Sequence, residues 1–175
     1  MIQHGPTHLM DGPVALREIT LEDAPNLFRW RGQEHVRRLF HSSGAASYEQ
    51  HEAFVRRYFE PGNDDCWFVI EVEGRPSGAV ALYRPTPGSP EWEAGRIVLG
   101  PEFRGYKGFR YARRAIALLM EFARQAGHGE MRCEVLEDNR VMRGIVTSLG
   151  FVETGAGERH GRGYREMVAP LGGTR

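Results

Sequence analysis

Runs of apolar and alternating residues along the chain predict several strands. Residues 66–74, CWFVIEVEG, are rich in β-branched and aromatic residues and form the strongest strand pattern. A turn at residues 73–76 leads into SGAVALYR, residues 77–84, so these two runs predict a hairpin. Val14 to Thr20 alternates apolar and polar residues, as a half-buried strand does. Further strands are expected at residues 95–100, 131–137 and 164–170.

A second spacing, of about 3.6 residues, predicts helices. The longest runs from Gly108 to Ala126, and its recurring apolar residues are Ala112, Ala115, Ile116, Leu119, Met120 and Phe122. Gly127 and Gly129 are expected to end it. Thr20 and Asp23 resemble a capping box that opens an earlier helix. A further helix is expected after Ser47 as N-cap, and a short one over residues 138–150.

The order of these elements is strand, two helices, three strands, long helix, strand, short helix, strand, which indicates a mixed α/β fold. Only the strand–helix–strand unit over residues 96–136 requires parallel pairing. Residues 1–12 lack periodicity and are expected to be a flexible arm, with residues 13–175 as a single domain. The glycine-rich segment 151–163 is expected to be a long hairpin or a mobile loop.

Composition narrows the classes of partner. Lys and Arg total 23 and Asp and Glu total 23, so no excess charge indicates binding to nucleic acid or to an anionic membrane. Cys66 and Cys133 lie in strand-like runs and are expected to be buried thiols. No apolar run approaches the ~20 residues of a membrane span, and no signal core is present, so a cytoplasmic protein is expected. The sequence leaves the oligomeric state open, a homodimer included.

Residues 98–109 join a strand to the long helix through a basic, glycine-containing loop. Gly105 and Gly108 allow backbone N–H groups to turn inward, and the helix dipole adds positive potential. Arg104, Lys107 and Arg110 supply charge for a pyrophosphate. The loop has neither a Walker Lys-Ser/Thr ending nor GxGxxG spacing, and an isolated loop of this kind is equally compatible with a solvated basic turn.

About thirty residues later comes CEVLEDN, residues 133–139, followed by LGF at residues 149–151. Together with the basic loop, these segments resemble the GNAT superfamily, whose motifs are an R/Q-x-x-G-x-G/A loop, a strand E-V-x-x-x-N and a helix ending in L-G-F. The resemblance extends from Val14 to Val168, and Phe109 stands where the loop motif has its last small residue. It implies a central, mostly antiparallel sheet of six to seven strands, splayed in the middle and flanked by about four helices. It also implies an acyltransferase that moves an acetyl group from acetyl-CoA to a primary amine, with no metal.

The resemblance also assigns residues to the cosubstrate. The pyrophosphate loop matches Arg104, Gly105, Tyr106, Lys107, Gly108 and Phe109. Val98 and Leu99 match positions whose backbone pairs with the pantetheine arm. Asn139 matches an asparagine that contacts the cofactor, and it is also a good N-cap for the following helix.

Two carboxylates are candidates for the general base. Glu134 comes first, because some family members carry a catalytic Glu there, and strand alternation places it opposite Cys133 and Val135. Its alternative is a structural ion pair with an arginine. Glu93 comes second, with ordinary loop charge as its alternative. The family's usual general acid, a tyrosine in the short helix, is Val146 here, so the thiolate is expected to leave with a proton from Tyr164 or a water, or with no proton donor.

The N-terminal half is expected to bind the acceptor. Trp30, Arg31 and Arg37 resemble a W-R-N-x-x-x-V-R pattern found in nucleotide-linked amino-sugar acetyltransferases and related ribosomal-protein N-terminal acetyltransferases, with Gly32 in place of the Asn. A basic and aromatic face is available for a diphospho-sugar and comprises Trp30, Arg31, Arg37, Arg38, His41, Tyr83 and Trp92. Leu27 and Phe54 are expected to be core anchors.

The leading hypothesis is therefore a small-molecule amine acceptor, an amino sugar, with protein N-terminal acetylation as the alternative. A different class stays open, because a GNAT-like fold can bind acyl-CoA as a sensor or assembly module without catalysis. The missing tyrosine favours that class, whereas Glu134 and the basic loop favour an enzyme.

Overall fold

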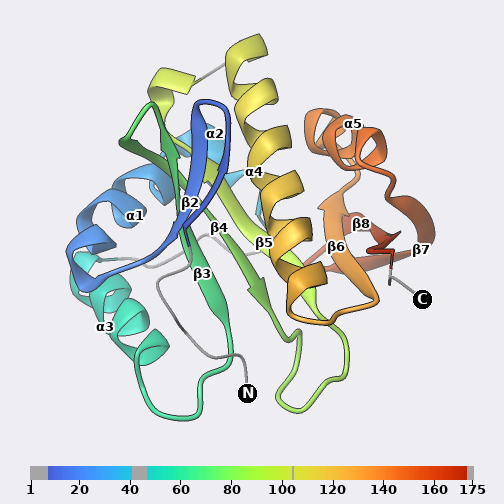
Figure 1. Cartoon of the computed structure of the whole chain (residues 1–175), viewed down its shortest axis with the longest axis horizontal. Coiled ribbons are helices and arrows are strands. Elements are labelled where there is room, and N and C mark those ends of the chain that lie inside the picture. Colours follow the sequence, from blue (N-terminus) through green and yellow to red (C-terminus); the bar gives the residue numbers. More distant parts are fainter. Residues whose placement is uncertain (1–7, 41–46, 104, 173–175) are drawn as a thin grey trace.

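The computed structural model describes residues 8–40, 47–103 and 105–172. These residues form one eight-stranded sheet in the order β1-β2-β3-β4-β5-β6-β8-β7, with five α-helices (Figure 1). The strands are β1 His8–Asp11, β2 Val14–Glu18, β3 Cys66–Val72, β4 Arg75–Tyr83, β5 Glu93–Leu99, β6 Glu130–Leu136, β7 Val152–Arg159 and β8 Arg162–Pro170. The helices are α1 Ala24–Arg31, α2 Glu34–Arg37, α3 Tyr48–Tyr58, α4 Gly105–Gln125 and α5 Arg140–Ser148, with 3-10 turns at Leu21–Asp23 and Pro101–Phe103.

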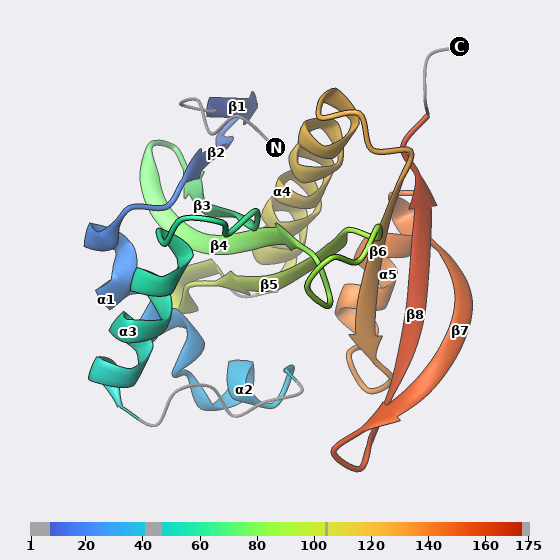
Figure 2. The same cartoon turned by 90° about the horizontal axis from the view of Figure 1, so that it is seen from below.

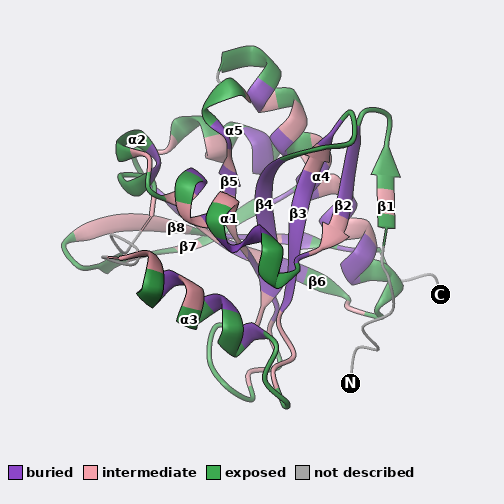
Figure 3. Cartoon of the chain, turned by 90° about the vertical axis from the view of Figure 1, so that its left-hand side faces the viewer, coloured by how far each residue is buried: buried purple, intermediate pink, exposed green. Residues whose placement is uncertain are grey.

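The sheet has a hydrophobic core on each face. On one face, Phe68 and Leu82 of the sheet pack with Ile116 and Leu119 of α4. On the other, Leu27 of α1 and Val55 of α3 pack with Trp67, Val69 and Val98 of the sheet. The central strands β3 and β4 are accordingly buried along most of their length (Figure 3).

Helix α4 follows from the predicted spacing of apolar residues. The predicted positions Ala112, Ala115, Ile116, Leu119 and Phe122 are all buried. The helix begins at Gly105, three residues earlier than predicted, and Gly127 follows its end at a φ of 88°, a left-handed conformation that glycine adopts without strain.

The sheet divides between β5 and β6. These two strands are the parallel pair that the strand–helix–strand pattern predicts, and the remaining neighbours are antiparallel. Only the pair Glu93 and Arg132 joins β5 to β6 in the described chain. Beyond it the strands diverge, so the sheet opens into two halves (Figure 2).

One expectation about the chain ends is corrected, and an alternative left open is decided. Residues 8–11, expected within a flexible arm, form β1 and pair with β2 from His8–Arg17 to Asp11–Val14. Their backbone groups gain partners across a turn at Gly12, which has a φ of 58°. The segment 151–163 was expected to be either a long hairpin or a mobile loop. It contains β7, which forms a hairpin with β8. With β1 and β7 included, the sheet has eight strands rather than six or seven.

Local signals near the N-terminus are confirmed. Thr20 and Asp23 form the predicted capping box, with the Thr20 backbone N–H donating to Asp23 at 2.8 Å. Ser47 accepts from the Gln50 backbone N–H at 3.3 Å and caps α3. Within the described residues, no helix is both long and apolar enough to span a bilayer.

Candidate active site

A cavity of about 620 Å³ occupies the opening between β5 and β6. Its walls come from the two diverging strands, the beginning of α4 and one side of α5. Val98, Leu99, Glu93, Glu134 and Asn139, all predicted site residues, line this one space. The splay of the sheet therefore brings together residues that are up to 46 positions apart (139 minus 93).

A bulge in β5 shapes the wall of the cavity. The register between β4 and β5 breaks between Ala79 and Ala81, and Arg96 adopts a φ of 52°, which is uncommon for a non-glycine residue. Val98 and Leu99 follow the bulge and line the cavity. A β-carbon on Gly78 would lie 2.3 Å from the Val98 carbonyl oxygen, so a glycine is needed there for β4 to approach β5.

The loop before α4 closes one end of the cavity. Arg104, the first predicted pyrophosphate ligand, lies outside the described residues. Gly105 has a φ of 72° and open space where a side chain would begin, so a ligand could approach its backbone closely. A β-carbon on Gly108 would lie 1.8 Å from the Phe103 carbonyl oxygen. Gly108 is therefore required for the packing of the loop itself, whatever else it contacts.

The other residues of this loop differ in solvent exposure. Tyr106 is 76% exposed and Lys107 is exposed, and neither lines the cavity. Phe109 is partly buried, packs against the core around α4 and lines the cavity. The loop and the first turn of a 21-residue helix together present backbone N–H groups and basic charge. Such groups could hold an anion, and Gly105, Gly108 and Phe109 line the same cavity as Glu93.

Asn139 acts as the N-cap of α5. Its side-chain oxygen accepts from the Met142 backbone N–H at 3.1 Å, which confirms the capping interpretation. Asn139 also lines the cavity, so one side chain both caps the helix and forms part of the cavity wall.

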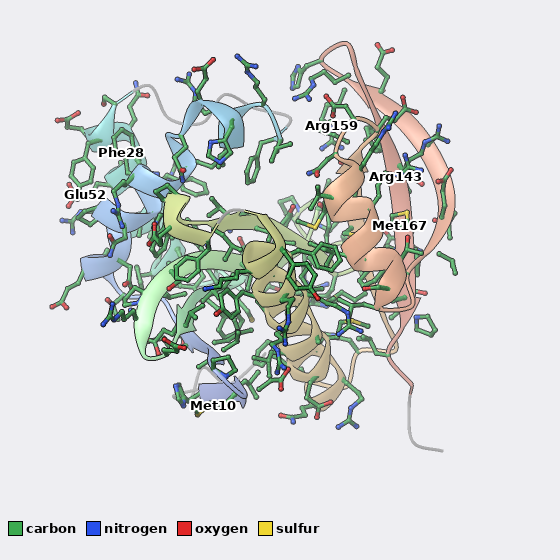
Figure 4. All side chains as sticks on the ribbon, turned by 90° about the horizontal axis from the view of Figure 1, so that it is seen from above. Met10, Phe28, Glu52, Arg143, Arg159 and Met167 are labelled. Atoms are coloured by element: carbon green, nitrogen blue, oxygen red, sulfur yellow. The ribbon has the colours of Figure 1, made fainter. Side chains whose placement is uncertain are left out.

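The two candidate carboxylates share the narrow end of the cavity. Glu134 forms an ion pair with Arg159 of β7, with 2.9 Å between Oε1 and Nη2. The ion pair with an arginine, given above as the alternative role of Glu134, is therefore present. Glu93 accepts a hydrogen bond of 2.7 Å from the Tyr83 hydroxyl. Figure 4 labels Arg159, which reaches Glu134 from the β7–β8 hairpin.

The surroundings of these groups change their acidity. Burial raises the pKa of Glu93, and the negative charge of Glu134 adds to this, while the Tyr83 hydrogen bond and the charges of Arg159 and Arg96 oppose it. Burial and the neighbouring Glu93 also raise the pKa of Tyr83. Cys133 is buried, and burial raises its pKa to about 12, so its thiol stays protonated. A carboxylate with a raised pKa is suited to accept a proton near neutral pH.

The model of the acetyltransferase (GNAT) domain matches residues 14–152. This chain belongs to the GNAT acetyltransferase family. It is accordingly an acyltransferase, and the predicted fold and enzyme class are confirmed. No curated protein matches the chain in sequence.

Solved structures share the GNAT fold at low identity. A spermidine N-acetyltransferase from Vibrio cholerae, in complex with CoA and spermine, superposes with a TM-score of 0.78 at 15% identity, covering 92% of this chain and 97% of its own. An acetyltransferase of the GNAT family from Bacillus anthracis gives 0.76 at 14% identity, covering 94% and 99%. A GCN5-related N-acetyltransferase from Brucella melitensis gives 0.74 at 18% identity, covering 95% and 80%.

This GNAT acetyltransferase lacks a tyrosine at the position expected for the acid. Val146 is buried and lines the cavity, and its side chain has no proton to donate. Tyr164, one suggested replacement, does not line the cavity, and the guanidinium of Arg159 lies 5.4 Å from its ring centroid. Tyr83 is the tyrosine that does line it. Sequence reasoning had placed Tyr83 only on the acceptor face.

The three residues predicted to bind the acceptor lie in different surroundings in the GNAT acetyltransferase. Trp30 was expected to contact the acceptor, but it has no exposed surface and packs in the core beneath α1, which corrects that prediction. Arg31 is partly buried, its guanidinium lies 3.5 Å from the Phe40 ring centroid, and it lines a second cavity. Arg37 is exposed and lines neither cavity. His41, on the predicted basic face, lies outside the described residues.

Arg31 and Arg37 are nevertheless electrostatic neighbours. Burial lowers the pKa of Arg31 to about 10, and the positive charge of Arg37 contributes to the decrease. They lie on different helices, since α1 ends at Arg31 and α2 begins at Glu34. Phe54, expected in the core, is 40% exposed and lines the second cavity, whereas Leu27 is buried as predicted.

Sequence reasoning missed the partners of the two carboxylates. Tyr83 pairs with Glu93 across β4 and β5, and Arg159 reaches Glu134 from a hairpin 25 residues away. No local motif marks either partner. No cluster of three or more His, Cys, Asp and Glu side chains in the described chain could hold a metal ion.

Proposed function

We propose that this GNAT acetyltransferase moves the acetyl group of acetyl-CoA to a primary amine, with Glu93 as the general base. The observation that carries the proposal is the Tyr83–Glu93–Glu134 cluster at the point where β5 and β6 diverge. Glu93 replaces Glu134 as the first candidate, because Glu134 is engaged by Arg159 and Glu93 has the raised pKa.

The acetyl donor lies in the cavity between β5 and β6. The N–H groups of Gly105 and the first turn of α4 bind its diphosphate, with Lys107 and Arg104 adding charge. Val98 and Leu99 present their backbone to the pantetheine arm. Backbone N–H groups at the β5 bulge stabilise the oxyanion that forms when the amine adds to the thioester carbonyl.

Proton transfer then runs from amine to thiol through side chains of this chain. An alkylamine with a pKa of ~10.4 is mostly protonated at neutral pH, so it must lose a proton before it attacks. Glu93 accepts that proton. As the carbon–sulfur bond breaks, Tyr83 donates its hydroxyl proton to the leaving thiolate and recovers one from the Glu93 carboxylic acid over their 2.7 Å hydrogen bond. Protonation of Glu93 also removes the negative charge that raises the pKa of Tyr83.

The acceptor we propose is a nucleotide-linked amino sugar. The support is Arg31, a partly buried guanidinium beside Phe40, together with the nearby charge of Arg37. Two guanidinium groups are well suited to a diphosphate. The experiment is a mass-spectrometric screen of acetyl-CoA with UDP-amino sugars, peptides and polyamines, in which acetylation of a UDP-amino sugar is expected.

Other outcomes of that screen separate the alternatives. Acetylation of peptide N-termini, with none of the sugars, would replace the acceptor and leave the reaction in place. Binding of CoA without acetyl transfer to any amine would favour the non-catalytic role that Val146 suggests.

A further inference from the structure

A second cavity of about 940 Å³ lies on the opposite side of β5 from α4, beneath α1 and α3. Binding cavities for whole organic molecules have volumes of about 300–1,000 Å³. We call this space the arginine chamber, after the four arginines in its wall. They are Arg31, Arg56, Arg57 and Arg96. The chamber is far larger than an amino group requires, so it can hold the remainder of an acceptor.

The charge of the chamber is positive. Glu60 is the one acidic residue among its lining residues, against four guanidinium groups. Arg56 is paired with Glu52 at 2.7 Å and Arg96 with Asp65 at 2.9 Å. Within the described chain, Arg57 has no carboxylate in ion-pair range, and its guanidinium lies 5.7 Å from the Phe54 ring centroid.

Aromatic surface lies between the charges. The Phe54 ring has Arg57 near it and Arg96 at 5.5 Å. Trp67 meets Phe54 edge-on at 5.8 Å, and its buried indole N–H has no hydrogen-bond partner among the residues that the structure describes. Because Phe54 is 40% exposed, its ring is available to an apolar or aromatic part of a ligand.

The chamber adjoins the active site. Phe40, Arg96 and Val98 line both cavities, so the two spaces share part of their wall at the β5 bulge. An acceptor held in the chamber would have to reach past these residues to bring its amine to Glu93. Figure 4 shows Phe28 and Glu52 on the helical layer over the chamber, across the molecule from Arg159.

We propose that the arginine chamber binds the phosphate-bearing part of the acceptor through Arg57 and Arg31, stacks its ring on Phe54, and excludes polyamines. The inference rests on the proposed acetyl transfer and adds where and how the acceptor is selected. An ammonium group of a polyamine would be repelled by the guanidinium of Arg57, which has no carboxylate in ion-pair range within the described chain, and this disfavours its entry.

The test is calorimetry on the whole protein saturated with CoA, so that the loop before α4 is filled. UDP, L-glutamate and spermidine are titrated separately. UDP is expected to bind, Arg57→Ala to weaken it about tenfold, and Arg29→Ala to leave it unchanged. Arg29 is a matched control because it is an exposed arginine on α1 that lines neither cavity. Arg57→Glu is expected to weaken UDP binding further and to admit spermidine.

The outcomes separate the two proposals. Spermidine binding more tightly than UDP, or equal UDP affinity in the Arg57→Ala and parent proteins, would overturn the chamber assignment. Preference for L-glutamate would also overturn it, since the ligand would then be a carboxylate. If CoA itself does not bind, the acetyl-transfer proposal fails, and UDP titrated alone still decides whether Arg57 holds a phosphate.

Discussion

Tyr83 and Glu93 face each other across β4 and β5, and the phenol hydroxyl donates a hydrogen bond of 2.7 Å to the carboxylate. The position of the phenol depends on Gly95, because a β-carbon there would lie 2.5 Å from the Tyr83 hydroxyl oxygen. The pair lies at the last point where β5 and β6 are joined.

Glu93→Gln is expected to lower kcat by roughly 100-fold or more, because an amide cannot accept the amine proton. Affinity for CoA, measured by calorimetry, should stay unchanged, since Glu93 is not in the diphosphate loop. Glu158→Gln, an exposed glutamate on β7, is the control and should retain full activity. Full activity in Glu93→Gln would move the base to Glu134 or to no residue.

Glu134→Gln is expected to shift the pH dependence of kcat/KM. Glu93 works as a base when deprotonated, so activity rises with pH through its pKa. Removing the negative charge of Glu134 lowers that pKa, and the rising limb should move to lower pH. An unshifted limb accompanied by loss of nearly all activity would indicate that Glu134 is itself the base.

Tyr83→Phe should move the same limb in the opposite direction. The hydrogen bond from Tyr83 lowers the pKa of Glu93, so its loss should move the limb to higher pH and also decrease kcat. A pH profile identical to that of the parent enzyme would show that the hydroxyl does not contact the working base.

Gly105→Val is expected to weaken CoA binding by more than tenfold, about 1.4 kcal/mol, because the side chain would fill the space that the diphosphate needs. Gly127→Val is the matched control. Both glycines have positive φ, 72° and 88°, and both have open space around a β-carbon. The two variants should therefore share backbone strain, and only Gly105→Val should lose CoA affinity. Equal CoA affinities of the Gly105→Val and Gly127→Val variants would contradict the proposal that the loop before α4 binds the diphosphate.

Gly108→Ala is expected to lower the free energy of unfolding by about 1–3 kcal/mol, since its methyl group cannot fit beside the Phe103 carbonyl. Gly144→Ala, on α5 with no atom within 4 Å of the added carbon, should be neutral or stabilise by about 0.5–1 kcal/mol. Thermal and urea unfolding measure both. Equal stability of the two variants would contradict the close packing at Gly108.

Much of the fold could be predicted because its signals are local. The spacing from Ala112 to Phe122 encodes α4 in neighbouring residues, and the capping box joins Thr20 to a residue three positions away. The strand at residues 66–72 and the Asn139 cap follow the same logic. A sequence carries such patterns directly, since the interacting residues are close along the chain.

The site depended on long-range geometry. Trp30 and Phe54 are both aromatic residues on neighbouring helices, yet packing against the sheet buries the first and leaves the second facing a cavity. Glu93 became the first candidate for the general base, ahead of Glu134, because of contacts made across strands. Tyr83 hydrogen-bonds to Glu93, and Arg159 forms an ion pair with Glu134. Strand register and the divergence of β5 from β6 determine those contacts, and neither is encoded within one segment. The sequence alone thus determined the family and most of the helices and strands, because their signals lie in neighbouring residues, whereas β1, the Tyr83–Glu93 contact and the shape of the second cavity depended on the tertiary structure.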